Sequence, residues 1–486
     1  MKKTALYILV AGVLLAAGPA QARSSKRGVS ENQFALATQL EILAPGVGWY
    51  YNWGNAPTKG YQSQVENYEG MEFVPMCWNA NYNADAIRAY AKSHPGCKYL
   101  LGFNEPNFTA QANMTPQAAA QKWADVKALA DELGLELVAP ALNYSPNPPY
   151  TDPLRWMDEF VALVGTDAFD YVAVHNYGGL GGMKTLATAF HERYGKPVWV
   201  TEFCLWPNEG QADSRVEPAV QIASMIETVQ WLEQTPWIYR YAWFKAVGKH
   251  ENTPTSGSPC YGLIITENGL GERHLSPQGY VYTYMSDFDL ERWNPTGTDL
   301  AAADYVDQSI LGLGKGNNPD CPLPIEITQF NAGAYVDYQF DVPADGVYEL
   351  KLTVSGEGEP VRFDPSLGVS LVESDMVTVL AEPVTFALSG DDAVYTTQAF
   401  DLTLKAGHRR LRLFDGRQYQ PSGIRISTVR LDAKNGVEDI AADTTADITD
   451  GAVYTLDGRR VDPAAGLAPG LYIRRQGNAA SKILVR

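Results

Sequence analysis

Histidine and cysteine are scarce in this sequence, and neither is arranged as a metal site requires. The 486 residues include six His and five Cys, and no two cysteines have the CxxC spacing of structural zinc. We therefore expect no metal ion and no cofactor. So few histidines also give little support to a Ser-His-Asp triad. The glycine run at residues 178–182 lacks the GxGxxG pattern and the P-loop lysine, which argues against a nucleotide site.

Positive charge is scarce as well. Lys and Arg total 38 against 56 Asp and Glu, which gives a formal net charge of −18. Such a surface repels a polyanion, so nucleic acid is not an expected partner. No long low-complexity tract is present, and 11% of the residues are aromatic. This composition is typical of a folded protein and excludes disorder, collagen and coiled coil as the main state. We expect a monomer.

Long hydrophobic runs are almost absent, and the one run present lies at the N-terminus. Lys2 and Lys3 precede an apolar stretch, and Ala20-Gln21-Ala22 resembles a cleavage site. Residues 1–22 therefore read as a bacterial secretory signal peptide. The run is shorter than the roughly 18 to 20 residues that a membrane span needs. We expect a secreted or cell-surface protein without a span, in a compartment that permits one or two disulfides and leaves at least one thiol free.

Eight short apolar runs, typical of β-strands, alternate with helical candidates between residues 26 and 289. One helix is expected over residues 115–133, because Thr115-Pro116 forms a helix start and Gly134 a stop. Eight strands with helices over about 260 residues match the size of a (β/α)8 TIM barrel. The runs cover residues 27–29, 46–52, 72–78, 98–104, 135–141, 169–176, 197–203 and 238–244.

Helical signals nearly vanish after the barrel. Residues 298–432 alternate apolar and polar side chains, which predicts a β-sandwich of jelly-roll type. Residues 433–449 are polar and predict a linker, and residues 450–486 predict a small β domain. The predicted organisation is α/β followed by β: signal peptide 1–22, barrel 23–289, sandwich 298–432, linker 433–449 and C-terminal domain 450–486.

Aromatic, amide and carboxylate side chains gather where the predicted barrel strands end, which is the face that carries active sites in such barrels. Aromatic faces stack on pyranose rings, and amides and carboxylates bond sugar hydroxyls. We therefore predict a sugar-binding cleft, with Trp243 as the best candidate for its floor. The predicted substrate-binding residues are Asn52, Trp53, Trp78, Asn104, Asn143, His175, Tyr177, Trp206 and Trp243.

Two glutamates form the candidate catalytic pair. Glu105 follows one predicted strand and Glu202 ends another, with two strands between them, so they should face each other across the barrel mouth. Retaining glycosidases need an acid/base and a nucleophile about 5 to 5.5 Å apart. Tyr177 could bond Glu202, and His175 could bond sugar or position a glutamate. A single strand-end glutamate is more often structural, but the two together in an aromatic-rich mouth favour catalysis.

Seven motifs follow one another along the predicted barrel. They are Lys26-Arg27-Gly28-Val29, Trp49-Tyr50-Tyr51-Asn52-Trp53, Phe73-Val74-Pro75-Met76-Cys77-Trp78, Leu101-Gly102-Phe103-Asn104-Glu105-Pro106-Asn107, Ala139-Pro140-Ala141, Val174-His175-Asn176-Tyr177 and Trp199-Val200-Thr201-Glu202-Phe203. Together they resemble glycoside hydrolase family 128 over roughly residues 26–288. The resemblance implies hydrolysis of β-1,3-glucan, with Glu105 as acid/base on strand 4 and Glu202 as nucleophile on strand 7.

The later segments carry two further resemblances. Residues 298–432 are similar to a family 6 carbohydrate-binding module, in motifs such as Gly333-Ala334-Tyr335-Val336-Asp337-Tyr338. The tail, with Val453-Tyr454-Thr455-Leu456-Asp457-Gly458, resembles the C-terminal sorting domain of the Bacteroidetes type IX secretion system, which implies contact with secretion machinery.

Two alternatives to an endo-acting β-1,3-glucanase remain open. The first keeps the mechanism but changes the polymer to a β-1,4-glucan, a mannan or a xylan. The second is a surface glycan-binding protein that does not cleave its ligand. Retention of both glutamates argues against the second, since a binding protein needs no acid facing a nucleophile.

Overall fold

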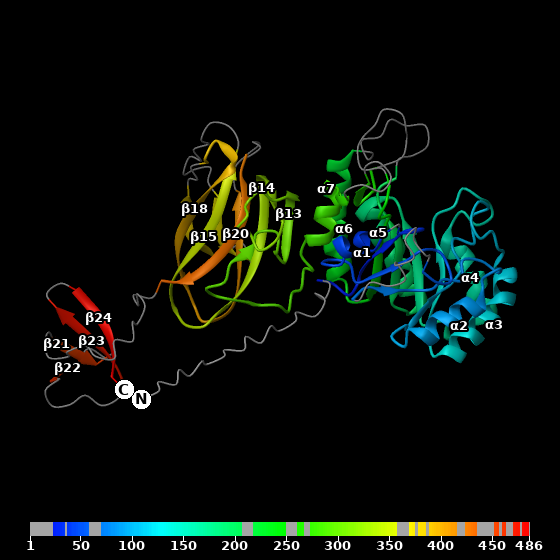
Figure 1. Cartoon of the computed structure of the whole chain (residues 1–486), viewed down its shortest axis with the longest axis horizontal. Helices are drawn as coiled ribbons and strands as arrows, with labels where there is room; N and C mark the ends of the chain where they lie inside the picture. The colour runs from blue at the N-terminus through cyan, green and yellow to red at the C-terminus, as the bar shows by residue number, and fades with distance from the viewer. Residues whose placement is uncertain are drawn as a thin grey trace, which may run out of the picture.

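The computed structural model shows a barrel, a β-rich second domain and a small C-terminal sheet (Figure 1). The structure describes residues 23–34, 36–57, 70–206, 217–248, 260–266, 273–356, 369–374, 378–384, 388–415, 423–434, 452–455, 459–462, 470–476 and 479–485. The predicted signal peptide lies outside these residues, and so does most of the predicted linker.

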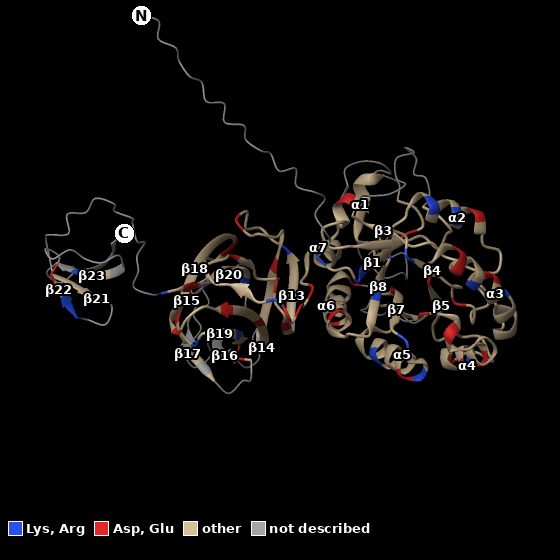
Figure 2. Cartoon of the chain, turned by 90° about the horizontal axis from the view of Figure 1, so that it is seen from below, with Lys and Arg blue, Asp and Glu red and all other residues tan. Residues whose placement is uncertain are grey.

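Eight parallel strands form the barrel, and each contains part of one predicted apolar run. The hydrogen-bonded order is β3-β2-β1-β8-β7-β6-β5-β4, and a parallel bridge between Met76 and Leu101 joins the two ends of this path. Figure 2 shows the strands inside a ring of helices. The arrangement fits the predicted (β/α)8 barrel. The strands are β1 (Arg27–Ser30), β2 (Trp49–Tyr51), β3 (Glu72–Phe73), β4 (Tyr99–Leu101), β5 (Glu136–Leu142), β6 (Tyr171–Asn176), β7 (Val198–Phe203) and β8 (Ile238–Phe244).

The helices follow the strands along the chain. In α3, the Thr115 hydroxyl accepts a hydrogen bond from the Ala118 amide at 3.2 Å, and Gly134 ends the helix at φ +66°. Both end signals predicted for this helix are therefore confirmed. The barrel helices are α1 (Ala37–Leu43), α2 (Ala84–Ser93), α3 (Pro116–Leu133), α4 (Pro153–Val164), α5 (Gly179–Tyr194), α6 (Pro218–Gln234) and α7 (Pro277–Tyr284), with a short hairpin of β9 (Ile264–Thr266) and β10 (Arg273–Leu275) before α7.

Large aromatic side chains fill the lower interior of the barrel. The Trp199 ring contacts the rings of Trp49 and Tyr99, with centroids 5.0 and 5.2 Å apart. The Arg240 guanidinium lies 4.5 Å from the Tyr99 ring centroid and donates to Glu72 at 2.6 Å. The charge of this half-buried guanidinium is thus both stacked and paired. The interior is a packed core that supports the mouth above it.

The second domain, called the sandwich below after the sequence prediction, is β-rich: its described strands form one ten-stranded sheet, and it packs on α6 and α7 of the barrel. Gln230 of α6 donates to the Asp307 carboxylate at 2.6 Å, and Gln234 donates to the Val306 carbonyl at 2.7 Å. The sandwich strands are β11 (Asn294–Pro295), β12 (Leu300–Ala301), β13 (Asp307–Lys315), β14 (Ile325–Val342), β15 (Gly346–Gly356), β16 (Val369–Glu373), β17 (Val379–Val384), β18 (Asp391–Leu404), β19 (Gly407–Asp415) and β20 (Arg425–Ala433).

The C-terminal segment forms a separate four-stranded sheet in the order β22-β21-β23-β24. These strands are β21 (Ala452–Thr455), β22 (Arg460–Val461), β23 (Gly470–Gln476) and β24 (Ala479–Val485). The β-rich region after the barrel agrees with the additional β domains expected from the sequence. Among the described residues, no helix is long and apolar enough to cross a bilayer.

The disulfide expectation is wrong for this fold. All five cysteines fall within the described residues, and all five are free thiols. They are Cys77, Cys97, Cys204, Cys260 and Cys321.

Candidate active site

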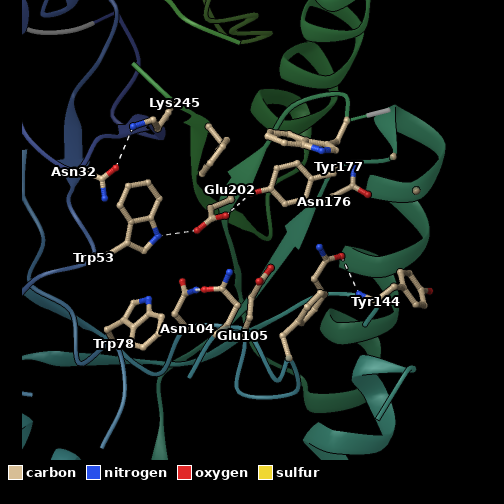
Figure 3. Close-up of a pocket in the computed structure, with 17 residues that line it drawn as sticks. Asn32, Trp53, Trp78, Asn104, Glu105, Tyr144, Asn176, Tyr177, Glu202 and Lys245 are labelled. Carbon is tan, nitrogen blue, oxygen red and sulfur yellow. Dashed lines mark hydrogen bonds between the residues drawn. The ribbon is translucent and has the colours of Figure 1, made fainter. Parts of the chain in front are cut away.

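A cavity of about 1,100 Å³ opens at the C-terminal ends of the barrel strands. This cavity is called the cleft below. Figure 3 shows aromatic and amide side chains around two glutamates at its centre. The lining residues are Asn32, Trp53, Trp78, Asn104, Glu105, Phe108, Gln111, Asn143, Tyr144, Asn176, Tyr177, Gly178, Gly182, Glu202, Trp206, Phe244 and Lys245.

Glu105 lies just beyond β4, on backbone that is fixed by the next strand. Its amide donates to the Ala141 carbonyl of β5 at 2.9 Å, and Asn104 forms a parallel bridge with Ala141. The residue has φ +40°, in the left-handed region that non-glycine residues rarely adopt. Such strain concentrates at functional sites, where surrounding structure holds it in place. The backbone thus aims this carboxyl group into the cleft.

Glu202 lies within β7 and is surrounded by hydrogen-bond donors. The Trp53 indole donates to its carboxylate at 2.8 Å, Tyr51 donates at 3.2 Å, and Tyr177 donates to the second oxygen. In Figure 3 the carboxylate lies between the Trp53 and Tyr177 side chains. Burial, and then the charge of Glu202, raises the pKa of both tyrosines well above the usual value. Both phenols therefore keep the protons they donate.

His175 links the two glutamates. It is fully buried on β6, and its Nδ1 lies 2.8 Å from Glu105 Oε1 and 3.4 Å from Glu202 Oε2. Its Nε2 lies 2.9 Å from the Thr201 hydroxyl. Burial lowers the pKa of His175, but the negative charge of Glu202 and the hydrogen bond to Glu105 outweigh this effect and raise it above its usual value. The imidazole thus holds the two carboxylates in a fixed relation.

The carboxylates are close enough to act on one bond. One oxygen of Glu105, one oxygen of Glu202 and one nitrogen of His175 all lie within 4.8 Å of one another. This spacing could also suit metal ligands, but both ring nitrogens of His175 are already hydrogen-bonded, to Glu105 and to Thr201. The geometry is that of a carboxylate pair bridged by imidazole, close to the separation that retaining glycosidases use.

The structure brings most of the predicted substrate-binding residues together. Trp53, Trp78, Asn104, Asn143, Tyr177 and Trp206 line the cleft beside the glutamates. His175 lies behind the lining and contacts both carboxylates.

Two predicted residues are elsewhere. Trp243, expected as the floor, is 1% exposed, and its indole donates to the Tyr261 carbonyl at 2.7 Å, so the prediction for Trp243 is wrong. Successive side chains of a strand alternate between faces, and Phe244, the next residue, lines the cleft instead. The Asn52 side chain is held in a local turn. Its oxygen accepts a hydrogen bond from the Gly54 amide, and its nitrogen donates to the Ala56 carbonyl.

Sequence reasoning missed a polar group at one side of the cleft. The Lys245 ammonium donates at 3.0 Å to Glu31 and to Asn32. Glu31 and Asn32 directly follow β1, and Lys245 directly follows β8. Because β1 and β8 are neighbours in the barrel, the positions of these residues directly after the two strands could have predicted that they meet.

The sequence matches the family model described as glycosyl hydrolase catalytic core over residues 28–270, which is half of the chain. One curated relative is alkali-sensitive linkage protein 1 of Schizosaccharomyces pombe, 25% identical over 235 residues. That match covers 46% of this chain and 39% of the relative, so the chain spans well under half of its length.

Solved structures of three GH128 enzymes also match, each over nearly its whole length. A subgroup II endo-β-1,3-glucanase from Pseudomonas viridiflava is 35% identical, with 54% of this chain and 98% of that chain covered and a TM-score of 0.47. A subgroup I endo-β-1,3-glucanase from Amycolatopsis mediterranei, in complex with laminaritriose, is 26% identical, with 54% and 99% covered and a TM-score of 0.41. A subgroup V exo-β-1,3-glucanase from Cryptococcus neoformans is 25% identical, with 53% and 98% covered and a TM-score of 0.42. Because the family model covers half of its length, the chain belongs to the family described as glycosyl hydrolase catalytic core.

Proposed function

We propose that this protein is a secreted, endo-acting, retaining β-1,3-glucanase. The observation that carries the proposal is the Glu105–His175–Glu202 cluster at the base of an aromatic-lined cleft. One carboxylate oxygen of each glutamate and one nitrogen of the imidazole lie within 4.8 Å of one another. Membership of the family supports glycoside hydrolysis. The substrate follows the relatives, two endo-acting and one exo-acting on β-1,3-glucan. The 35%-identical relative is endo-acting, which supports internal cleavage.

The environments of the two glutamates suggest separate roles. Glu202 accepts hydrogen bonds from Trp53, Tyr51 and Tyr177, which hold its carboxylate in place as the nucleophile. In the first step, its oxygen bonds to the anomeric carbon while the glycosidic bond breaks and the leaving oxygen takes a proton from Glu105. In the second step, Glu105 removes a proton from water, whose oxygen displaces Glu202 and restores the starting anomeric configuration.

Asn104 is suited to bind the sugar beside the scissile bond. Its side-chain oxygen is buried and accepts no hydrogen bond from any described residue. A buried acceptor without a donor costs free energy, which a sugar hydroxyl would recover. In this proposal the 2-hydroxyl donates to Asn104, and this bond strengthens in the transition state.

The other segments complete the proposal. The signal-like residues 1–22 support export, and the resemblance of residues 450–486 to a sorting domain supports delivery to the cell surface. The resemblance of residues 298–432 to a family 6 module supports glycan binding by the sandwich.

The test is product analysis on a linear β-1,3-glucan with wild type, Glu105→Gln and Glu202→Gln. Each variant removes a proton donor or a nucleophile while keeping the side-chain shape, so we expect at least about a hundredfold loss of kcat. Glu72→Gln is the matched control, because Glu72 pairs with Arg240 at the N-terminal end of β3, away from the cleft. NMR of the first products should show the β-anomer.

Other outcomes separate the alternatives. Cleavage of a β-1,4-glucan, mannan or xylan but not of β-1,3-glucan would keep the mechanism and overturn the substrate. Release of sugar from none of these polymers would favour a glycan-binding protein. A ladder of oligosaccharides indicates endo action, whereas a single small product would contradict it.

A further inference from the structure

Lys245 is the only cation among the described residues that line the cleft. It directly follows β8, and Asn32, which also lines the cleft, is the second residue after β1. These two strands are neighbours, so their ends meet at one side of the mouth. The catalytic steps proposed above use neither residue. A cation in a cleft for a neutral polymer therefore needs an explanation of its own.

A buried carboxylate holds the Lys245 side chain. The Glu31 side chain is 4% exposed, and one of its oxygens accepts from the Lys245 ammonium at 3.0 Å and from the Asn32 amide at 2.9 Å. The other oxygen accepts from the Val247 amide at 2.6 Å. Glu31 thus joins the segments that follow β1 and β8. The ammonium is fixed in place before any ligand arrives, which lowers the entropy cost of binding.

Lys245 keeps one donor available, in contrast to another partly buried lysine, Lys26. An ammonium carries three N–H groups. In Lys26, all three donate to backbone carbonyls at the C-terminal end of α6, at 2.8 to 3.4 Å. In Lys245, two donate, to Glu31 and Asn32, and the third meets no acceptor within the part of the chain that the structure describes. The Lys245 side chain is 19% exposed at the lining of the cleft, so this N–H is accessible to a ligand.

The charges around Lys245 favour a neutral acceptor. Glu31 offsets the Lys245 charge at 3.0 Å, and the carboxylates of Glu105 and Glu202 line the same cleft. An anionic ligand would gain little from the paired ammonium and would be repelled by these carboxylates. A hydroxyl oxygen can accept the remaining N–H, and a hydrogen bond from a charged donor is stronger than one from a neutral donor. The site therefore suits an uncharged ligand that bears hydroxyl groups.

The strand order places Lys245 on the side of the nucleophile. β8 lies between β1 and β7, and β7 carries Glu202, whereas Glu105 follows β4, across the barrel from β8. In Figure 3, Lys245 and Tyr144 lie on opposite sides of the two glutamates. In the mechanism proposed above, Glu202 retains the glycone, which is the part of the substrate on the non-reducing side of the broken bond. Glu105 protonates the oxygen that leaves. A sugar beside Lys245 therefore belongs to the glycone.

We propose that Lys245 binds substrate, donating its third N–H to a hydroxyl group of the glycone, and that Glu31 positions the ammonium. The identity of the polysaccharide rests on the function proposed above. A hydroxyl group that does not react keeps this bond in both the substrate complex and the transition state. Loss of the bond should therefore raise KM and change kcat little.

Hydrolysis of 4-nitrophenyl β-trisaccharides tests this proposal, because release of nitrophenol reports binding in which all three sugars lie on the glycone side. The four substrates contain β-1,3-linked glucose, β-1,4-linked glucose, β-1,4-linked mannose or β-1,4-linked xylose. The test variant combines Lys245→Met with Glu31→Gln, which removes the donor without leaving a buried carboxylate unpaired. On the substrate that wild type hydrolyses best, we expect a KM about tenfold higher and a kcat within about twofold of wild type.

Glu31→Gln alone tests the positioning role. It keeps the ammonium but weakens its support, so KM should rise about threefold while kcat stays the same. Should the double variant not fold, this variant decides alone.

The matched control is Lys26→Met. Lys26 carries the same charge but precedes β1, at the end of the barrel opposite the cleft. The substitution should lower the unfolding temperature, because three carbonyls lose their donor, and should leave KM and kcat within about twofold of wild type.

Substrates that lack one hydroxyl group distinguish binding from a structural role of Lys245. Each free hydroxyl of the best trisaccharide is removed in turn. Removal of the hydroxyl that Lys245 binds should raise the KM of wild type about tenfold and cause no further rise for the double variant. If every removal changes the KM of both proteins by the same factor, Lys245 binds no hydroxyl and the proposal is overturned.

Other outcomes are equally decisive. An unchanged KM of the folded double variant overturns the proposal, as does a loss on polymers alone, which would place Lys245 against the leaving part of the substrate. The expected rise on a trisaccharide other than the β-1,3-linked one would sustain this site and refute only the proposed polymer. If wild type hydrolyses none of the four, affinity electrophoresis in the corresponding polymers decides. Weaker retardation of the double variant would then sustain the site and refute the activity, and equal or absent retardation would overturn the proposal.

Discussion

At the residue scale, the cluster around His175 couples stability to pH. The pKa of this imidazole is raised above the usual 6.5, so the folded state binds its proton more tightly than the unfolded state does. The resulting stabilisation is fully present below pH 6.5 and is lost as pH rises through the higher pKa of the folded state.

We therefore expect His175→Gln to lower the free energy of unfolding by about 2 kcal/mol at pH 5, the scale of a hydrogen bond to a charged group. The difference from wild type should shrink as the pH rises above 6.5. Urea unfolding between pH 5 and pH 9 measures it. A difference that stays constant or grows with pH would contradict the raised pKa.

The glutamates and the error at Trp243 show how far strand ends can be predicted. Glu105 and Glu202 follow from counting strands, because the C-terminal ends of parallel strands meet at one mouth. Trp243 and Phe244 are adjacent, and only the register of β8 decides which of them faces the cleft. Both are large and apolar, so composition could not separate them.

At the scale of elements, Gly28 allows β1 to pack against β2. A Cβ at Gly28 would lie 2.2 Å from the Trp49 ring, and Trp49 is fixed by its indole bond to the Lys26 carbonyl at 2.9 Å. Gly28→Ala should therefore cost about 3 kcal/mol of unfolding free energy. Gly181 in α5 is the control, since a Cβ there meets nothing within 4 Å. Gly181→Ala should be neutral or stabilise by up to about 1 kcal/mol.

Equilibrium denaturation of both glycine variants gives the comparison. A Gly28→Ala protein as stable as wild type would show that the indole can move aside. The same substitution should lower the unfolding free energy at Gly28 and leave it unchanged or raise it at Gly181. A steric clash dominates at the strand position, and backbone entropy dominates at the helix position, so the comparison separates the two effects.

Elements with local signals were predictable, and those that depend on distant contacts were not. The α3 helix carries its N-cap at Thr115 and its stop at Gly134, and the structure has both. The disulfide expectation came from the inferred compartment, but cysteine pairing requires Cα atoms within about 7 Å. That Cys77, Cys204 and Cys260 are buried as free thiols is a tertiary fact that their spacing in the sequence does not contain.

At the scale of the whole molecule, the barrel and the sandwich share one continuous hydrophobic core. Phe288, after the barrel, contacts Tyr305 of the sandwich with ring centroids 5.7 Å apart. Asp307 joins α6 to β19 through Gln230 and Arg410. A shared core favours cooperative unfolding of both parts.

Calorimetry should accordingly show one transition for the barrel and the sandwich, with equal calorimetric and van't Hoff enthalpies per cooperative unit. Asp307→Ala removes contacts to both sides and should lower the stability of this unit by about 2 kcal/mol. Two well-separated transitions in wild type, assigned to barrel and sandwich by proteolysis, would contradict the coupling.

The rings of Trp49, Tyr99 and Trp199 pack together and fill the barrel below its mouth. Any molecule that reaches the centre of the barrel therefore enters and leaves through the mouth. In the retaining mechanism proposed above, the departing sugar leaves through the same mouth by which water enters. A second sugar that reaches the anomeric carbon before water would accept the glycosyl group from Glu202 through one of its hydroxyls, and a chain would be lengthened instead of shortened.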